Sequence, residues 1–173
     1  MPQSFDREFT AFVSERGDAL FRVAYALAGD RHSAEDLLQN ALAKAYARWG
    51  RIRGEAEPYV RRILYHDQVS GWRRRRLRPE VPLDSVPDRS AGGALDHEAA
   101  LRLMLRDALR MLPPRQRAVL VLRYLDDLSV EQTAEVLSCR AGTVASQASR
   151  ALAKLRELVP AFDEIAARPE VLR

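Results

Sequence analysis

A short segment rich in proline and glycine divides the sequence into two longer parts. Residues 77–97, LRPEVPLDSVPDRSAGGALDH, contain three prolines and two glycines and show no apolar period. Proline lacks the backbone N–H that helices and sheets use, and its ring fixes one backbone angle, so this density opposes regular structure. We interpret the segment as a flexible linker, which predicts a separately folded domain on either side of it.

The part before the linker, residues 5–76, has the apolar spacing of helices. Apolar side chains recur at intervals of three and four residues, and the alternation typical of strands is absent. Gly17 interrupts the first stripe, so we predict two helices there. We predict that Ser33 is the N-cap residue of the next helix. A further helix is predicted from Tyr59 to about Arg76.

The part after the linker, residues 98–159, has the same spacing and predicts four helices. The sequence LPPRQR ends the first of them and starts the second. Ser129 and Gln132 have the spacing of a capping box at the start of the third, and the fourth begins near Ala141. We expect the tail, residues 160–173, to be a frayed helix or loosely ordered. The predicted fold class is all-α, with two small helical domains.

The composition restricts the functional classes. Hydrophobic residues make up 47% of the 173 residues, which is enough for real cores, and the net charge of +4 suits a nucleic-acid partner. The single cysteine, Cys139, excludes an internal disulfide. The N-terminal sequence MPQSFDREFTAF lacks the apolar stretch of a secretion signal, and no segment approaches the roughly 18 apolar residues of a membrane span. We therefore expect a soluble cytoplasmic protein without a membrane partner.

The chemistry of an enzyme is not evident in the sequence. The three histidines, His32, His66 and His97, are scattered, and no carboxylates are clustered for a metal. Asp126 and Asp127 are adjacent, so on a helix they would point apart. A glycine-rich phosphate loop is also missing. These observations predict no catalytic residues, no metal and no cofactor.

The sequence SVEQTAEVLSCRAGTVASQASRAL has the proportions of a helix-turn-helix: a short helix, a tight turn and a longer second helix. Such a motif places the start of its second helix in the major groove of DNA. No acidic residue occurs from Val136 to Arg156, whereas an ordinary exposed helix carries both charges. Arginine and glutamine can pair with guanine and adenine edges. The side chains predicted to contact DNA are Arg140, Thr143, Ser146, Gln147 and Arg150.

The sequence YVRRILYHDQVSGWRRRRLR is the second candidate for nucleic-acid contact. The segment contains seven arginines and a single acidic residue, Asp67, and aromatic residues lie among the arginines. Arginines attract phosphates, and aromatic rings stack on unpaired bases, so the combination favours melted DNA. Contact with nucleic acid explains the arginines better than the alternative, a solvated end of a helix. For Tyr65 and Trp72, burial in a core is at least as good an explanation as contact with nucleic acid. The predicted contacts are Arg61, Arg62, His66, Trp72, Arg73, Arg74, Arg75 and Arg76.

Taken together, the chain resembles the extracytoplasmic-function sigma factors of bacterial RNA polymerase, and within them the SigE-like subgroup of actinobacteria. The similar segments are DREFTAFVSERGDALFRVAYALAGDRHSAEDLLQNAL, YVRRIL, SGWRRRR, LPPRQRAVLVLRYLDDLSVEQTAEVL and GTVASQASRALAKLREL, which span both parts in order. The resemblance implies a sigma region 2 domain at 5–76, a linker at 77–97, and a sigma region 4 domain at 98–159.

The resemblance also implies partners and roles. The first domain would bind core RNA polymerase at a coiled coil of its β′ subunit, and read and melt the −10 promoter element. The second would dock on the β flap and read the −35 element through the helix-turn-helix. The protein would be no enzyme itself, and an anti-sigma factor is a possible further partner. The implied core-polymerase contacts are Asp36, Leu37, Gln39 and Asn40.

Four positions depart from the pattern of similar sequences. These tend to have glycine at Ser138, serine at Arg140, lysine at Ala145 and often asparagine at His66. The first three changes motivate an alternative, a degenerate sigma-like interaction protein that binds polymerase or a regulator without reading promoters. A plain duplex-binding repressor is a further alternative, but it leaves the arginine-rich helix unexplained.

Overall fold

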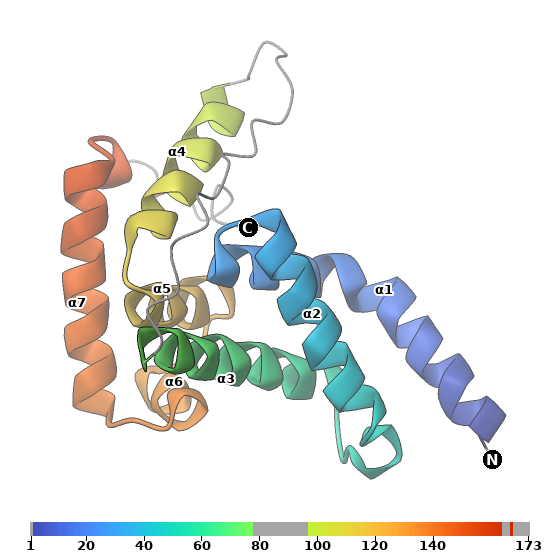
Figure 1. Ribbon diagram of the computed structural model, residues 1–173. Helices are drawn as coiled ribbons and strands as arrows, with labels where there is room; N and C mark the ends of the chain where they lie inside the picture. Colours follow the sequence, from blue (N-terminus) through green and yellow to red (C-terminus); the bar gives the residue numbers. More distant parts are fainter. Residues whose placement is uncertain (1, 78–96, 164–166, 168–173) are drawn as a thin grey trace.

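The computed structural model describes residues 2–77, 97–163 and 167, and their side chains from 5–71, 99–163 and 167 (Figure 1). Within these ranges the chain is helical and contains no strand, so the predicted all-α class is confirmed. Of the predicted linker, 77–97, the residues 78–96 lie outside the described residues, while Leu77 is the last residue of α3 and His97 the first of α4. The elements are α1 (Pro2–Ala28), α2 (Arg31–Tyr46), η1 (Trp49–Arg51), α3 (Ala56–Leu77), α4 (His97–Met111), α5 (Pro114–Leu120), η2 (Val121–Leu125), α6 (Val130–Leu137) and α7 (Ala141–Leu158).

The first helix is longer than the sequence predicts. α1 runs through Gly17 without a break, so the prediction of two helices is wrong. A glycine inside a helix costs about 1 kcal/mol relative to alanine. Burial of the apolar stripe that follows, including Leu20 and Ala24 at 0% exposure, offsets that cost.

The cap of α2 also differs from the prediction. Asp30, in an extended conformation, is the N-cap residue, and its carboxylate accepts a hydrogen bond of 2.9 Å from the backbone N–H of Ser33. Ser33 is therefore the recipient of the cap and not the cap. Aspartate and serine are both good N-cap residues. The observed cap lies three residues before the predicted one, so the side chain that caps α2 is that of Asp30.

The predicted starts of the later helices are confirmed. Pro114 stands at the beginning of α5, and Ser129 and Gln132 form a complete capping box at the start of α6. α5 continues into η2, a single π-helical turn. Asp127 follows it with a positive φ of 50°, which turns the chain toward α6.

The main hydrophobic core joins the two parts of the sequence. Leu20, Leu27 and Leu64 come from the first part, while Val119 and Leu122 come from the second, and all are at most 1% exposed. In Figure 1, α3 lies beside α5 and α6, and α3 makes contacts with both. The apolar helix faces predicted from periodicity in the first part of the chain are thus buried partly against those of the second part.

A second, smaller core lies between α4, α5 and α7. It contains Leu105, Ala151 and Leu155, together with Phe162 from the C-terminal segment. The sequence predicts a frayed helix or a loosely ordered tail from residue 160. Phe162 is only 5% exposed, so the described beginning of the tail is packed against this core.

Candidate nucleic-acid interface

The corner between α6 and α7 is built without glycine, and no side chain caps the start of α7. Ser138 has φ 51° and ψ 50°, the left-handed conformation that glycine adopts most easily. The N–H of Cys139 donates to the carbonyl of Ala134 at 2.9 Å, which closes the end of α6. Arg140 is the N-cap residue of α7, with extended backbone and no side-chain hydrogen bond to the helix. No side chain caps the amides of Ala141 and Gly142, which can therefore bind an anion, while the N–H of Thr143 donates to the carbonyl of Arg140 at 2.9 Å.

The first turns of α7 present a polar face. Arg140, Ser146 and Arg150 are exposed, and Thr143 and Gln147 are half-buried. The opposite face, including Val144 and Ala151 at 0% exposure, packs into the core. The Ser146 hydroxyl donates to the carbonyl of Thr143 at 3.0 Å, which leaves its lone pairs available for a donor. The structure brings the five predicted helix-turn-helix residues together on one exposed helix face.

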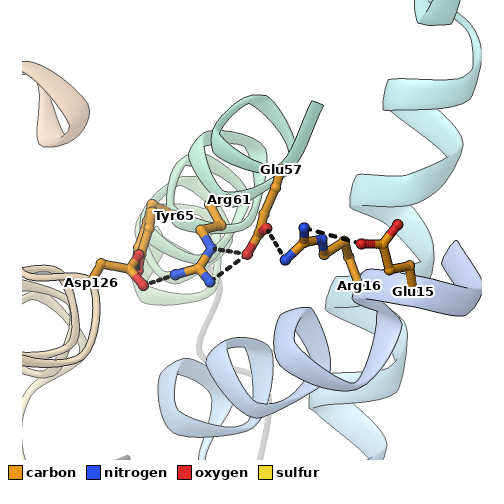
Figure 2. A network of polar contacts seen from close by, with 6 residues as sticks. All are labelled: Glu15, Arg16, Glu57, Arg61, Tyr65 and Asp126. Carbon is orange, nitrogen blue, oxygen red and sulfur yellow. Dashed lines mark hydrogen bonds and ion pairs between the residues drawn. The ribbon is translucent and has the colours of Figure 1, made fainter. Parts of the chain in front are cut away.

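The arginine-rich helix α3 is partly covered. Arg61 donates to the carboxylate of Glu57 through Nη2 at 2.6 Å and through Nε at 3.2 Å, and its Nη1 bonds Asp126 (Figure 2). Tyr65, 1% exposed, donates its hydroxyl to the carboxylate of Asp126. Burial raises the pKa of Tyr65, so the hydroxyl stays protonated. Tyr65 is therefore a core residue.

The other predicted residues of α3 differ in what the structure shows of them. Arg62 is exposed and His66 is half-buried. Trp72, Arg73, Arg74, Arg75 and Arg76 lie on the backbone of α3, which extends to Leu77, but their side chains lie outside the described residues.

On α2, three of the four predicted polymerase contacts share an exposed face. Asp36, Gln39 and Asn40 are exposed, and the Asp36 carboxylate lies 3.6 Å from Nε2 of His32. Leu37 is 8% exposed and packs in the main core. Its apolar side chain packs inward, away from the exposed face that the other three share.

Two polar residues at the junction of the two parts, Asp126 and Arg117, were not predicted from the sequence as contacts between those parts. Arg117 is 7% exposed, and its guanidinium donates to five carbonyl oxygens, two of them at the end of α1. Arg117 shares a helix face with buried Leu120 and Val121, and this spacing could have revealed it.

Among the described residues, no group of three histidine, cysteine or acidic side chains is placed to hold a metal ion. In the same part of the chain, none of the helices is both long and apolar enough to cross a membrane.

Comparison with known proteins covers both parts of the chain. The model of sigma-70 region 2 matches residues 12–78, and that of sigma-70 region 4 matches residues 102–155. The chain is 43% identical to the RNA polymerase sigma-E factor of Streptomyces coelicolor over 90% of this chain and 88% of that protein. It is 42% identical to the sigma-E factor of Streptomyces avermitilis, over 90% and 87% of the two chains. The solved structure of the sigma factor RpoE of Bartonella quintana, in complex with the anti-sigma factor NepR, has a TM-score of 0.69 and 28% identity, covering 89% of this chain and 98% of that one.

Proposed function

The chain belongs to the sigma-70 family as an extracytoplasmic-function sigma factor. We propose that three of its surfaces bind the −35 element, the −10 element and core polymerase, respectively. Sigma factors of this family bind core RNA polymerase and promoter DNA and direct transcription initiation, and so does this chain. The alternative of a degenerate protein that does not read promoters is not favoured, because the likeness extends over nearly the whole length of named sigma factors.

The start of α7 is the proposed reader of the −35 element. The observation that carries this proposal is the exposed face of Arg140, Thr143, Ser146, Gln147 and Arg150, which holds no carboxylate. Arginine and glutamine on this face can donate to base edges, and the uncapped amides of the helix can bind a phosphate.

The helix α3 is the proposed contact to the −10 element. Arg61, Arg62 and His66 lie on its described part, and the run Arg73–Arg76 follows with Trp72 before it. Positive side chains along one helix would hold the separated strands through their phosphates, while an aromatic ring would stack on a base. We infer from the resemblance that residues 5–76 form the region 2 domain and residues 98–159 the region 4 domain, with 77–97 as linker and 160–173 as tail.

The face of Asp36, Gln39 and Asn40 on α2 is the proposed contact to the β′ coiled coil of core polymerase. Its support is that the three polar side chains are exposed on one helix. The region 4 domain would dock on the β flap. The chain would contribute no catalytic group, would act in the cytoplasm beside polymerase, and would be held by an anti-sigma factor, as the Bartonella relative is by NepR.

Selection of genomic fragments by the reconstituted holoenzyme, followed by binding assays on the selected duplexes, tests the assignment of α7. We expect Arg150→Ala to weaken duplex binding about tenfold, since a good base contact contributes about 1–3 kcal/mol. Arg156→Ala is the matched control, because Arg156 lies on the same helix but bonds Asp163 at 2.9 Å. Equal losses for both variants would contradict the assignment.

A further inference from the structure

A pocket with a volume of about 380 Å³ lies between α1 and α4. This volume is at the lower end of the range found for pockets that hold small organic molecules. The residues that line the pocket include none of those proposed to contact DNA or polymerase. The α1–α4 pocket is therefore a feature that the proposed function does not explain.

Four arginines line the α1–α4 pocket, and no carboxylate is among the described residues that line it. Arg102, Arg106 and Arg110 follow one another at intervals of four residues, so they form one stripe along α4. Arg22 belongs to α1, on the other side of the pocket. Like charges that converge on a concave surface raise the local positive potential, which attracts anions.

Two of these arginines have no acidic partner in the part of the chain that the structure describes. Arg106 lies over the ring of Tyr25, with 5.2 Å between its Cζ and the ring centroid, and its Nε is buried without a hydrogen-bond acceptor among the described residues. Arg22 is exposed and forms no ion pair with a described carboxylate. A buried donor without a partner is uncommon in a folded protein and costs free energy. An anion can therefore bind these guanidiniums without displacing a carboxylate of the described chain.

The remainder of the lining is mostly apolar. Phe21, Leu105 and Leu109 contribute to it, and the ring of Phe21 packs against that of Tyr25 with the centroids 6.1 Å apart. A small inorganic ion would leave this surface in contact with water. A ligand that carries an apolar ring beside its anionic group would instead bury it, which is favourable.

The charge of the pocket favours phosphate as the anionic group. A phosphate monoester carries close to two negative charges at neutral pH and has three acceptor oxygens, whereas a carboxylate has one charge and two oxygens. Guanidinium groups bind phosphate through paired, charge-assisted hydrogen bonds. Several arginines around one small space therefore match a phosphate better than a carboxylate.

We propose that the α1–α4 pocket binds a small organic phosphate. The phosphate lies between Arg22 and Arg106, and Arg102 and Arg110 add to the positive potential. The apolar body of the ligand packs against the lining formed by Phe21, Leu105 and Leu109. The inference goes beyond the proposed function, because it adds a ligand that is neither DNA nor protein.

Isothermal titration calorimetry of the full-length chain at low salt tests the proposal, with naphthyl phosphate as the probe. Two matched compounds separate the parts of this ligand: naphthol has the ring without the charge, and inorganic phosphate has the charge without the ring. We expect naphthyl phosphate to bind at a single site and at least about tenfold more tightly than either compound, since both halves of the pocket are then used.

Four variants locate the binding site. Arg22→Gln and Arg106→Gln should each weaken binding of naphthyl phosphate about tenfold, because each removes a charge-assisted hydrogen bond. Ala26→Phe leaves every charge in place and fills the pocket from α1, so it should weaken binding by a similar factor. Arg115→Gln is the matched control: it removes the same charge from α5, outside the pocket, and should change affinity less than about twofold.

Equal affinities for naphthyl phosphate and inorganic phosphate would overturn the proposal. Equal losses in Arg22→Gln and Arg115→Gln would overturn it as well, and because Arg22 is exposed, this comparison does not depend on whether Arg106→Gln folds normally. Unchanged binding in Ala26→Phe would mean that the phosphate lies on surface arginines and not in the pocket, which also contradicts the proposal. The titration contains neither DNA nor polymerase, so its failure is distinguishable from failure of the proposed function.

Discussion

Gly29 and Arg117 meet at the C-terminus of α1: a Cβ added to Gly29 would lie 2.9 Å from Nη1 of Arg117. Gly29 also has φ 90°, which L side chains rarely adopt. The absence of a side chain at this position thus lets a buried guanidinium reach the last carbonyls of α1. The joint between the two parts of the chain depends on this pair.

Gly29→Ala should destabilise the protein by about 3 kcal/mol, since it adds a steric conflict to a strained backbone. Urea unfolding followed by circular dichroism measures the loss. Gly54→Ala is the control, because Gly54 has a similar φ of 95° but open space around it. It should lose only the strain, about 1–2 kcal/mol. The added Cβ would also lie 2.9 Å from Cγ of Arg110, so equal losses would mean that the close approach of these two arginines contributes nothing.

Arg117→Lys should cost about 3 kcal/mol, because lysine keeps a charge but has neither the fork nor the five donors that serve the carbonyls. Burial lowers the pKa of Arg117 to about 10, so the group is still charged at neutral pH. Arg115→Lys, on the same helix and only half-buried, should change unfolding by less than about 0.5 kcal/mol. The prediction fails if the two variants unfold at the same urea concentration.

Ser138→Gly should stabilise the protein by about 1 kcal/mol, since it removes the left-handed strain at the corner between α6 and α7. Ser149→Gly introduces the same residue within α7, where it should destabilise by about 0.5–1 kcal/mol. Unfolding midpoints of the two variants should therefore move in opposite directions. A loss of stability in Ser138→Gly would contradict the interpretation of the corner.

Arg140→Ser should separate stability from DNA binding. A serine at the N-cap can accept from the amides of α7 and should add about 1 kcal/mol of stability. The same change removes an exposed cation from the proposed −35 face, so binding to the selected duplex should weaken, and the salt dependence of binding should fall by about one unit of slope if Arg140 touches a phosphate. Unchanged DNA affinity would remove Arg140 from the contact set.

Local features of the fold were predictable from the sequence because their causes are local. The capping box of Ser129 and Gln132 and the proline at the start of α5 each act within a few residues, and the structure has them as predicted. Gly17 misled the prediction for the same reason: its local cost is real, but it is smaller than the burial of the long stripe on α1.

The joint between the two parts was not predictable from the sequence. Periodicity shows that Leu122 is on a buried face, but not that this face lies against α1 and α3. Arg61 and Asp126 are 65 residues apart, and an isolated carboxylate gives no indication of a distant partner. The proposed α7 face followed from the sequence, since removing the buried stripe of one helix leaves its exposed side.

Run-off transcription tests the central claim most directly. Core polymerase would be combined with the purified chain on the fragments that the holoenzyme selects, with core polymerase alone as the reference. We expect transcripts with a defined start on these fragments only when the chain is present, and their loss when the −35 or −10 segment is replaced. Binding to core polymerase without any promoter-dependent transcript would contradict the function of this chain in promoter recognition.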